Sequence, residues 1–464
     1  MILKNALLYT NDSLQEGSLL ILNGKISSII IDNSEHDLKS ILGKNEDGIE
    51  IDCEKRKILP GIIDIHSHLR DMGQSEKETF SSGTLAAAFS GITTVFNMPN
   101  TIPPAITENQ IKIWMEKAKD KIHVNVGFIA GVPKKIELKE IISIIDLGII
   151  GFKIYPLGSL NEIDWTNYLN VQKILSISSK LQIPIFIHPD WSLTPDEKSE
   201  IYSSGTQNNM SILKIHNNMY PASLEAKYVN FILENYYKII ADMDLSIDGY
   251  PIIHFCHISC KDSYSLIQRA LDMKPDLKIT FETTPHHLLL ANTILLNNPN
   301  YGKVLPPLRD EEHSLFLFEE LKKGNIKLIG TDHAPHTLKE KTQDYFNAPS
   351  GFPGFETYAL TLLDKVHRNE LSLETFVKVA SENPAKIFKI KNKGFIKEGY
   401  DADLFIVEKI PESPINPEAF KTKAKFSPFE DYKTTVQIWK VFLSGVEISN
   451  TAAEPRGRII KQSN

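Results

Sequence analysis

The sequence IHSH, at residues 65–68, places two histidines one residue apart at the end of an apolar run, with Arg70 two residues further on. In an extended strand alternate side chains point to the same side, so His66 and His68 can both face one point. Two imidazoles that converge suit a divalent metal ion. Because pairs with this spacing also occur by chance on protein surfaces, a metal site needs further ligands elsewhere in the chain.

The elements that must position these residues alternate along the middle of the chain. Strand-like apolar runs are followed in most cases by helix-like stretches such as 108–121, 223–243 and 261–273. The eight runs are 61–65, 92–96, 123–128, 149–154, 183–187, 251–256, 277–282 and 326–331. This alternation predicts a parallel α/β sheet, and eight units fit a closed (β/α)8 TIM barrel, with a doubly wound open sheet as the alternative.

Polar residues follow several of these runs, at the strand ends where a barrel carries its active site. They are Asn100 after 92–96, Lys153 within 149–154, His188 after 183–187, His257 after 251–256 and Asp332 after 326–331. Four histidines and one aspartate can bind one or two divalent ions of the zinc kind. Two such ions would supply a hydroxide nucleophile at neutral pH. We expect Asp332 to accept its proton and to return it to a leaving nitrogen.

Lys153 does not fit a ligand set as an ammonium group, because metal cations would repel it. Two interpretations are open at this point. A salt-bridged lysine near the barrel rim is the one that sequence chemistry alone favours. The other is a carbamate formed with carbon dioxide, whose anionic oxygens could bridge two metal ions.

Both ends of the chain have β character. Residues 1–56 contain short strand-like runs separated by Asn11-Asp12 and Asn23-Gly24, and 394–410 and 434–448 are similar. We therefore expect one small β-sandwich built from both ends. The predicted division is 1–56 for the N-terminal part of the sandwich, 57–390 for the barrel, and 391–464 for the C-terminal part and tail.

The overall composition is that of an ordinary globular protein of 464 residues, with 42% apolar residues, 23% charged residues and a net charge of −7. The charges are dispersed, which argues against nucleic acid or anionic membrane as the main partner. Three cysteines are too few for a disulfide framework, and no apolar run approaches the length of a membrane span. With no signal-peptide pattern at the start, these features predict a cytoplasmic protein.

Six segments together resemble the dihydroorotases, a family of cyclic amidohydrolases in the amidohydrolase superfamily. They are HSHLRD, NMPNTIPP, GFKIYP, HFCHIS, PPLRD and GTDHAPHT, in that order along the chain. The resemblance implies reversible cyclisation of N-carbamoyl-L-aspartate to (S)-dihydroorotate, a step of pyrimidine biosynthesis. It also implies a homodimer and association with aspartate transcarbamoylase.

The same resemblance implies roles for individual residues. His66, His68 and Asp332 would hold one zinc ion, His188 and His257 would hold a second, and a carboxylated Lys153 would bridge them. The residues implied in binding the substrate carboxylate and ring are Arg70, Asn100, Leu305 and His336. An arginine, an asparagine and a histidine also offer several donors to a planar anion on purely chemical grounds.

The chain mixes features of the longer and shorter branches of that family. Leu305 stands where the longer branch commonly has an asparagine, so any contact there should come from the backbone. The shorter branch has a Thr-Thr tip that closes over substrate. Here the matching stretch PLGSLNEIDW offers only Ser159 as a hydroxyl, which leaves the identity of the substrate-covering loop open.

Other functions are compatible with the same ligand residues. Allantoinase or dihydropyrimidinase activity would use the same metal ligands, and a catalytically silent scaffold is a third alternative. We expect His254 either to pack in the interior or to support the ligands from behind. Cys256 should lie in the core, and His333 should face away from the site. Glu282 could support the site, and His286 and His287 are not expected to bind metal.

Overall fold

The computed structural model describes residues 1–31, 49–448 and 454–462. Its central sheet is parallel, and its strands follow one another around the sheet in chain order. The strands are β6 (Ile62–Ser67), β7 (Ile92–Asn97), β8 (Asn125–Gly131), β9 (Gly151–Ile154), β10 (Ile185–Ile187), β11 (Ile253–Phe255) and β12 (Ile279–Phe281). Their side chains are buried on both faces, with the single exception of a half-buried Thr280, which explains why they appear as continuous apolar runs in the sequence.

The eighth predicted strand, 326–331, closes the barrel through isolated bridges. Ile329 pairs with Thr283 beyond β12, and His333 pairs with Ser67 at the end of β6, both in parallel orientation. The run is too short to form a full ladder because Asp332 adopts a left-handed conformation, with φ of 48°, that turns the chain out of the strand. The fold is the predicted TIM barrel with an attached β-sandwich domain.

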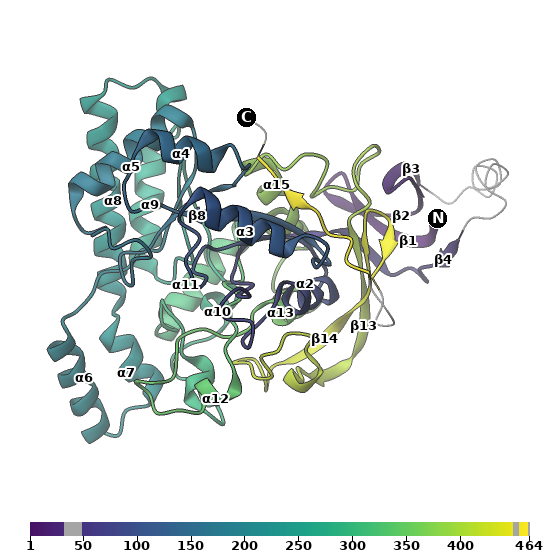
Figure 1. Cartoon of the computed structure of the whole chain (residues 1–464). Coiled ribbons are helices and arrows are strands. Elements are labelled where there is room, and N and C mark those ends of the chain that lie inside the picture. Colours follow the sequence, from purple (N-terminus) through teal and green to yellow (C-terminus); the bar gives the residue numbers. More distant parts are fainter. Residues whose placement is uncertain (32–48, 449–453, 463–464) are drawn as a thin grey trace.

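Helices cover the outside of the barrel (Figure 1). They are α2 (Phe80–Phe89), α3 (Glu108–Ala118), α4 (Leu138–Ile145), α5 (Tyr168–Leu181), α8 (Ala222–Asp242), α9 (Lys261–Met273), α11 (Glu311–Lys322), α13 (Phe355–His367), α14 (Leu373–Val377) and α15 (Asn383–Ile387). Several begin with a side-chain cap; the Thr79 side chain, for example, accepts from the backbone N–H of Ser82 and so sets the start of α2. The predicted helices at 108–121, 223–243 and 261–273 correspond to α3, α8 and α9.

The second sheet combines strands from both ends of the chain. N-terminal strands are β1 (Ile2–Thr10), β2 (Ser13–Leu22), β3 (Lys25–Ile31), β4 (Glu50–Asp52) and β5 (Lys57–Pro60), and C-terminal strands are β13 (Leu404–Pro414), β14 (Lys433–Leu443) and β15 (Val446–Glu447). β5 joins the two groups because it pairs with both β1 and β13. The sheet therefore extends past residue 56, and the division at 1–56, 57–390 and 391–464 stays a prediction.

The C-terminal segment returns to the barrel. β16 (Ile459–Ile460) pairs in parallel with Val126 and Gly127 of β8, and the Arg458 carbonyl accepts from the Val126 amide at 2.9 Å. Within the barrel, Ile65, Phe96 and Phe186 form an apolar cluster, and Ile460 packs against it. This segment thus pairs with the start of β8, whereas residues 129–131 of the same strand pair with β9.

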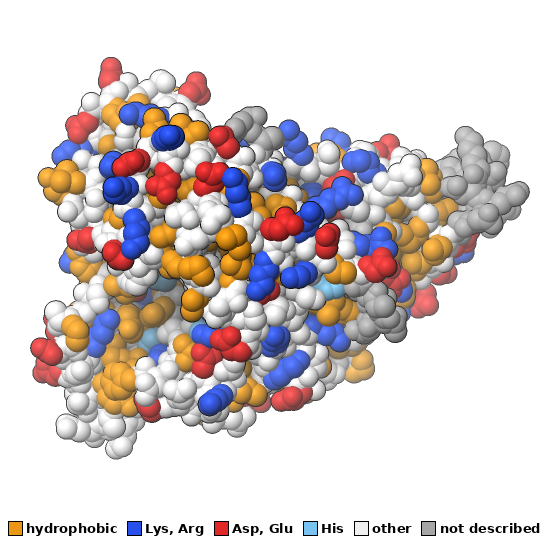
Figure 2. Space-filling view, viewed as in Figure 1, with side chains coloured by type: hydrophobic (Ala, Val, Ile, Leu, Met, Phe, Trp, Pro, Cys, Tyr) orange, Lys and Arg blue, Asp and Glu red, His pale blue; other side chains and the backbone are white. Residues whose placement is uncertain are grey.

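The long connection between β10 and β11 forms α6 (Pro195–Gln207), α7 (Ile212–Met219) and α8. α6 and α7 project from the molecule together with α12 (Leu338–Lys341) at the lower left of Figure 1. Figure 2 shows a hollow above this projection with histidine side chains visible inside it, and acidic and basic side chains interspersed over the same face. Among the described helices none is long and apolar enough to cross a membrane.

Candidate active site

The tightest part of the site is formed by His66, His68 and Asp332. Nε2 of His68 lies 3.1 Å from Oδ1 of Asp332, and Nε2 of His66 lies 3.5 Å from the same oxygen. The three residues are buried, and their ligand atoms lie within 4.8 Å of one another. Two imidazole nitrogens and a carboxylate oxygen that face one point are a suitable ligand set for zinc or a similar divalent ion.

The other ring nitrogens of these histidines are held by oxygen acceptors. Nδ1 of His66 contacts Oε1 of Glu282, and Nδ1 of His68 lies 2.6 Å from Oδ1 of Asn100. A ring nitrogen that faces such an oxygen carries the proton, which leaves Nε2 as the metal-binding atom. Asn100 therefore orients His68 in this structure, and its predicted contact with substrate stays a prediction.

The electrostatics of this cluster favour a positive charge among its members. Burial alone would raise the pKa of Asp332, but the close contact with His68 and the fields of His66 and His68 hold that pKa below its usual range. Burial and Lys153 would lower the pKa of His66, but Glu282 and Cys256 raise it overall. A bound cation at Nε2 would supply the positive charge that this environment favours.

His188 and His257 form the second part of the site. Their ring centroids are 4.5 Å apart, and the His257 ring lies 5.1 Å from the His66 ring. Burial, with His188 and His66 nearby, holds the pKa of His257 well below its usual range, so the imidazole is neutral and able to bind metal. His188 follows β10, and Nε2 of this residue lies 3.9 Å from Oδ2 of Asp190.

Lys153 lies on β9 and is 2% exposed. Its Nζ donates to Sγ of Cys256 at 2.8 Å and lies 5.1 Å from the centre of the Tyr155 ring. None of the described acidic side chains lies within ion-pair distance of this amine. Its positive charge acts on the nearby His66 and His257, where it acts to lower the pKa of each imidazole. The salt-bridged interpretation of Lys153 is therefore wrong, and a buried amine without an acidic partner is compatible with the carbamate.

Arg70 and His336 lie together at the edge of the ligand cluster. The Arg70 Nε donates to the Pro335 carbonyl at 3.2 Å, and Nη2 lies 3.2 Å from Nε2 of His336. Burial, with Arg70, Lys77 and Lys341 nearby, holds the pKa of His336 well below its usual range. Leu305 is half-buried, and the neighbouring Pro306 carbonyl lies 3.1 Å from Nε2 of His287.

The sequence matches the family described as "Amidohydrolase family" over residues 58–448. This chain belongs to the amidohydrolase family. A protein named dihydroorotase from Methanosphaera stadtmanae is 34% identical over 448 residues, which are 96% of this chain and 95% of that protein. One of the same name from Pyrococcus horikoshii is 35% identical over 89% of this chain and 87% of its own length.

Solved structures of related proteins have the same fold as this amidohydrolase. The L-hydantoinase (dihydropyrimidinase) of Arthrobacter aurescens superposes with a TM-score of 0.84 at 23% identity, over 99% of both chains. The dihydropyrimidinase of Brevibacillus agri gives 0.83 at 23% identity, over 100% of this chain and 98% of that one. These likenesses support the barrel and sandwich architecture.

Two residues contact the site in ways that were not predicted from the sequence. Cys256 is fully buried as predicted, but its thiol contacts Lys153 instead of only filling the core. The Tyr155 hydroxyl is buried without a hydrogen-bond partner among the described residues, and its ring lies 6.0 Å from that of His188. Alternation along the GFKIYP strand, which puts Tyr155 on the side of Lys153, was a signal for it.

Expectations for the residues behind the ligands are confirmed. Glu282 contacts His66, and its Oε2 lies 3.3 Å from Nε2 of His254. The His254 ring packs against Phe186 and Phe388. His333 faces away from the ligand cluster, because its ring stacks on that of Phe355 with a centroid distance of 3.8 Å.

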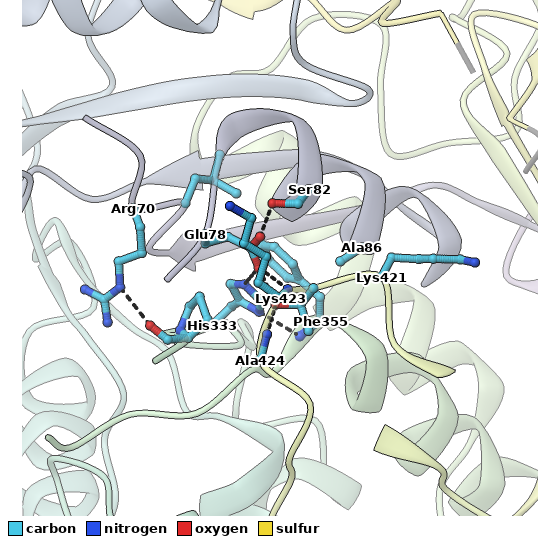
Figure 3. A network of polar contacts seen from close by, with 12 residues as sticks. Arg70, Glu78, Ser82, Ala86, His333, Phe355, Lys421, Lys423 and Ala424 are labelled. Carbon is cyan, nitrogen blue, oxygen red and sulfur yellow. Dashed lines mark hydrogen bonds and ion pairs between the residues drawn. The ribbon is translucent and has the colours of Figure 1, made fainter. Parts of the chain in front are cut away.

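The loop that carries Asp332 is supported through the next residue, His333, which belongs to a network of polar contacts with Glu78 (Figure 3). Nδ1 of His333 accepts from the Gly354 amide at 3.2 Å, and Nε2 faces Oε2 of the buried Glu78 at 3.8 Å. Glu78 is itself held by Ser82 and by Thr422 and Lys423, which belong to the C-terminal part of the chain. The His333 carbonyl accepts from the His68 amide at 2.7 Å, so this network supports both loops of the first ligand group.

Proposed function

We propose that this amidohydrolase is a dihydroorotase, which interconverts N-carbamoyl-L-aspartate and (S)-dihydroorotate in pyrimidine biosynthesis. The observation that carries the proposal is similarity along nearly the whole chain to proteins of that name, at 34% identity to one from Methanosphaera and 32% to one from Bacillus cereus. The buried Arg70 beside the ligand cluster supports it, because a guanidinium group suits the carboxylate of such a substrate.

We further propose that two zinc ions bind per chain. His66, His68 and Asp332 would hold one ion, His188 and His257 the other, and a carboxylated Lys153 would lie between them. The mutual contacts of the first three residues and the neutral state of His257 support this assignment. Bound ions of this kind would supply Lewis acidity and lower the pKa of a water molecule.

The side chains of the protein then have separate tasks. Asp332 would take a proton from the attacking water during hydrolysis and give it to the leaving ring nitrogen, and it would act in reverse during ring closure. Arg70, Asn100 and His336 would bind the substrate carboxylate and ring. The Leu305 contact would come from its backbone, since its side chain cannot form hydrogen bonds.

Three wider features are also part of the proposal. The resemblance suggests a homodimer and association with aspartate transcarbamoylase. A cytoplasmic location is supported by three cysteines that are all buried and unpaired. Light scattering of the purified protein, alone and mixed with the transcarbamoylase, tests the first two features.

The test of the main proposal is turnover in both directions by purified protein. The chain is stripped with a chelator, reloaded with zinc in bicarbonate buffer, and assayed with dihydroorotate and with N-carbamoyl-aspartate. We expect zinc-dependent turnover of both and a content of two zinc ions per chain. No turnover in either direction after reloading would contradict the proposal, and a zinc content near zero would indicate a silent scaffold instead.

Another cyclic amidase function is the alternative, and the hydantoinase and dihydropyrimidinase structures that share the fold are consistent with it. Arg70 separates the two functions, because a ring without a carboxylate has little use for a guanidinium. Arg70→Ala should raise the KM for dihydroorotate much more than the KM for an uncharged hydantoin ring. Equal losses for both substrates would favour the hydantoinase alternative.

A further inference from the structure

Lys77 contacts the proposed substrate-binding residue His336 from a stretch that none of the six family-like segments includes. Lys77 precedes α2, and its Nζ lies 3.2 Å from Nδ1 of His336. The same ammonium group is paired with Oε1 of Glu340 at 2.8 Å, and its side chain is 16% exposed. Glu340 is held in turn by the Thr337 hydroxyl and amide, both at 2.9 Å, so the Lys77 head group has a defined position.

The contact determines which nitrogen of His336 carries the proton. A lysine ammonium group has three donors and no acceptor, so this contact is a hydrogen bond only when Nδ1 of His336 is unprotonated. Oε2 of Glu340 lies 3.7 Å from the same nitrogen, beyond hydrogen-bond distance. The hydrogen of the neutral ring is then on Nε2, where the Ser350 carbonyl at 3.1 Å accepts it. Lys77 and Ser350 thus favour the same tautomer from opposite sides of the ring.

This tautomer has a consequence for Arg70. Nη2 of Arg70 lies 3.2 Å from Nε2 of His336, but a protonated Nε2 has no lone pair to accept a hydrogen bond from it. The Nη2 hydrogens therefore remain for an anion. In the other tautomer Nε2 would accept from Arg70, and the guanidinium would lose a donor to its own neighbour.

We propose that Lys77 is a positioning residue that keeps His336 in the Nε2–H tautomer and thereby leaves the Arg70 guanidinium free to bind the carboxylate of the substrate. The kinetic part of this inference rests on the proposed dihydroorotase function. The tautomer itself can be observed independently of any activity.

Lys77→Met removes the ammonium group, and Lys77→Arg restores a donor at the same place. Lys440→Met is the matched control, because Lys440 forms a comparable half-buried pair with Glu447 at 2.6 Å on the sandwich sheet. We expect Lys77→Met to raise the KM for dihydroorotate about tenfold to a hundredfold, as for the loss of a hydrogen bond to a charged group. The kcat should stay within about threefold of wild type, and the other two variants should resemble wild type.

A double-mutant cycle separates two ways in which Lys77 could act. One is through the His336 tautomer and Arg70, and the other is direct attraction between the Lys77 charge and the substrate anion. If Lys77 acts through Arg70, adding Lys77→Met to Arg70→Ala should produce little further loss. Fully additive losses, or equal KM values for Lys77→Met and Lys440→Met, would overturn the proposal.

Nitrogen-15 NMR of histidine-labelled protein shows directly which ring nitrogen of His336 is protonated. The His336 signal is assigned by its loss in the His336→Asn variant. We expect Nε2–H in wild type and in Lys77→Arg, and a mixture or the other tautomer in Lys77→Met. A wild-type His336 that is protonated on Nδ1 would overturn the proposal. If wild type shows no turnover while these spectra hold, the dihydroorotase function fails and the tautomer assignment stands.

Discussion

The two halves of the metal-ligand cluster differ in how far the protein itself completes them. His66, His68 and Asp332 contact one another, and Glu282 and Asn100 hold the Nδ1 atoms of the two histidines. In the other half, Nδ1 of His257 and the Tyr155 hydroxyl are buried without hydrogen-bond partners among the described residues, and Oδ2 of Asp190 shares this state.

This difference indicates how the site is assembled. Buried polar atoms are normally paired, so atoms without a partner mark a place that a bound group is expected to complete. The first half is preorganised by the protein, whereas in the proposed arrangement the half around Lys153, His188 and His257 would depend on the carbamate and its cations.

The largest effect is expected from the preorganised half. Asp332→Asn removes the proposed general base and replaces one carboxylate oxygen with an amide nitrogen while it keeps the shape of the side chain. We expect hydrolysis and ring closure both to fall about a thousandfold, since general acid–base catalysis contributes about 10²–10⁴-fold. Steady-state kinetics with zinc analysis measures this. A loss below tenfold would show that Asp332 is not the proton carrier.

A smaller but more specific effect is expected at Lys153. Lys153→Met retains an apolar chain of similar length but cannot form a carbamate. We expect zinc to fall from two ions to about one per chain and activity to fall about a hundredfold, because one ion would remain with His66, His68 and Asp332. If Lys153→Met retains two zinc ions, the division between the halves is wrong.

Glu282→Gln tests the support behind the ligands. Loss of the carboxylate weakens the hydrogen bond to Nδ1 of His66, and such outer partners typically contribute 10–100-fold to metal affinity. We expect a weakening of about that size in a zinc titration. Glu320→Gln on α11 is the control, because Glu320 is a buried glutamate bonded to Tyr264 and Asn325 on the outside of the barrel. Equal affinities for the two variants would contradict the role of Glu282.

The pH dependence gives the smallest change per step, because it is measured one pH unit at a time. The pKa of Asp332 lies below its usual range, so the carboxylate is ionised near neutral pH and is ready to act as a base. Hydrolysis should stay level down to acidic pH, whereas ring closure needs the protonated form and should fall by up to about tenfold per pH unit as pH rises. Initial rates in both directions measure this, and identical profiles would exclude one residue serving both roles.

Most of the fold and the positions of the candidate histidines could be predicted because each rests on local sequence. Runs such as 92–96 are buried on both faces and therefore appear apolar throughout, and His66, His68, His188 and His257 stand at the ends of such runs. The eighth run was the weakest strand, since the left-handed conformation of Asp332 ends it early.

Contacts across the barrel could not be predicted in the same way. Lys153 lies on β9 and Cys256 directly follows β11, and β10 separates these two strands, so their contact depends on the curvature of the closed sheet. Lys77 and His336 are brought together by two loops with no local pattern in common. Burial alone made Cys256 look like a core residue, and its chemical neighbour is visible only in three dimensions.

Anomalous diffraction at the zinc edge, from crystals grown with zinc and bicarbonate, would locate the metal ions relative to all the proposed ligands at once. We expect two peaks at the ends of the barrel strands, one beside His66, His68 and Asp332 and one beside His188 and His257, with density for a carboxylated Lys153 between them. A single peak with an unmodified Lys153, or zinc bound away from these residues, would contradict the proposed site.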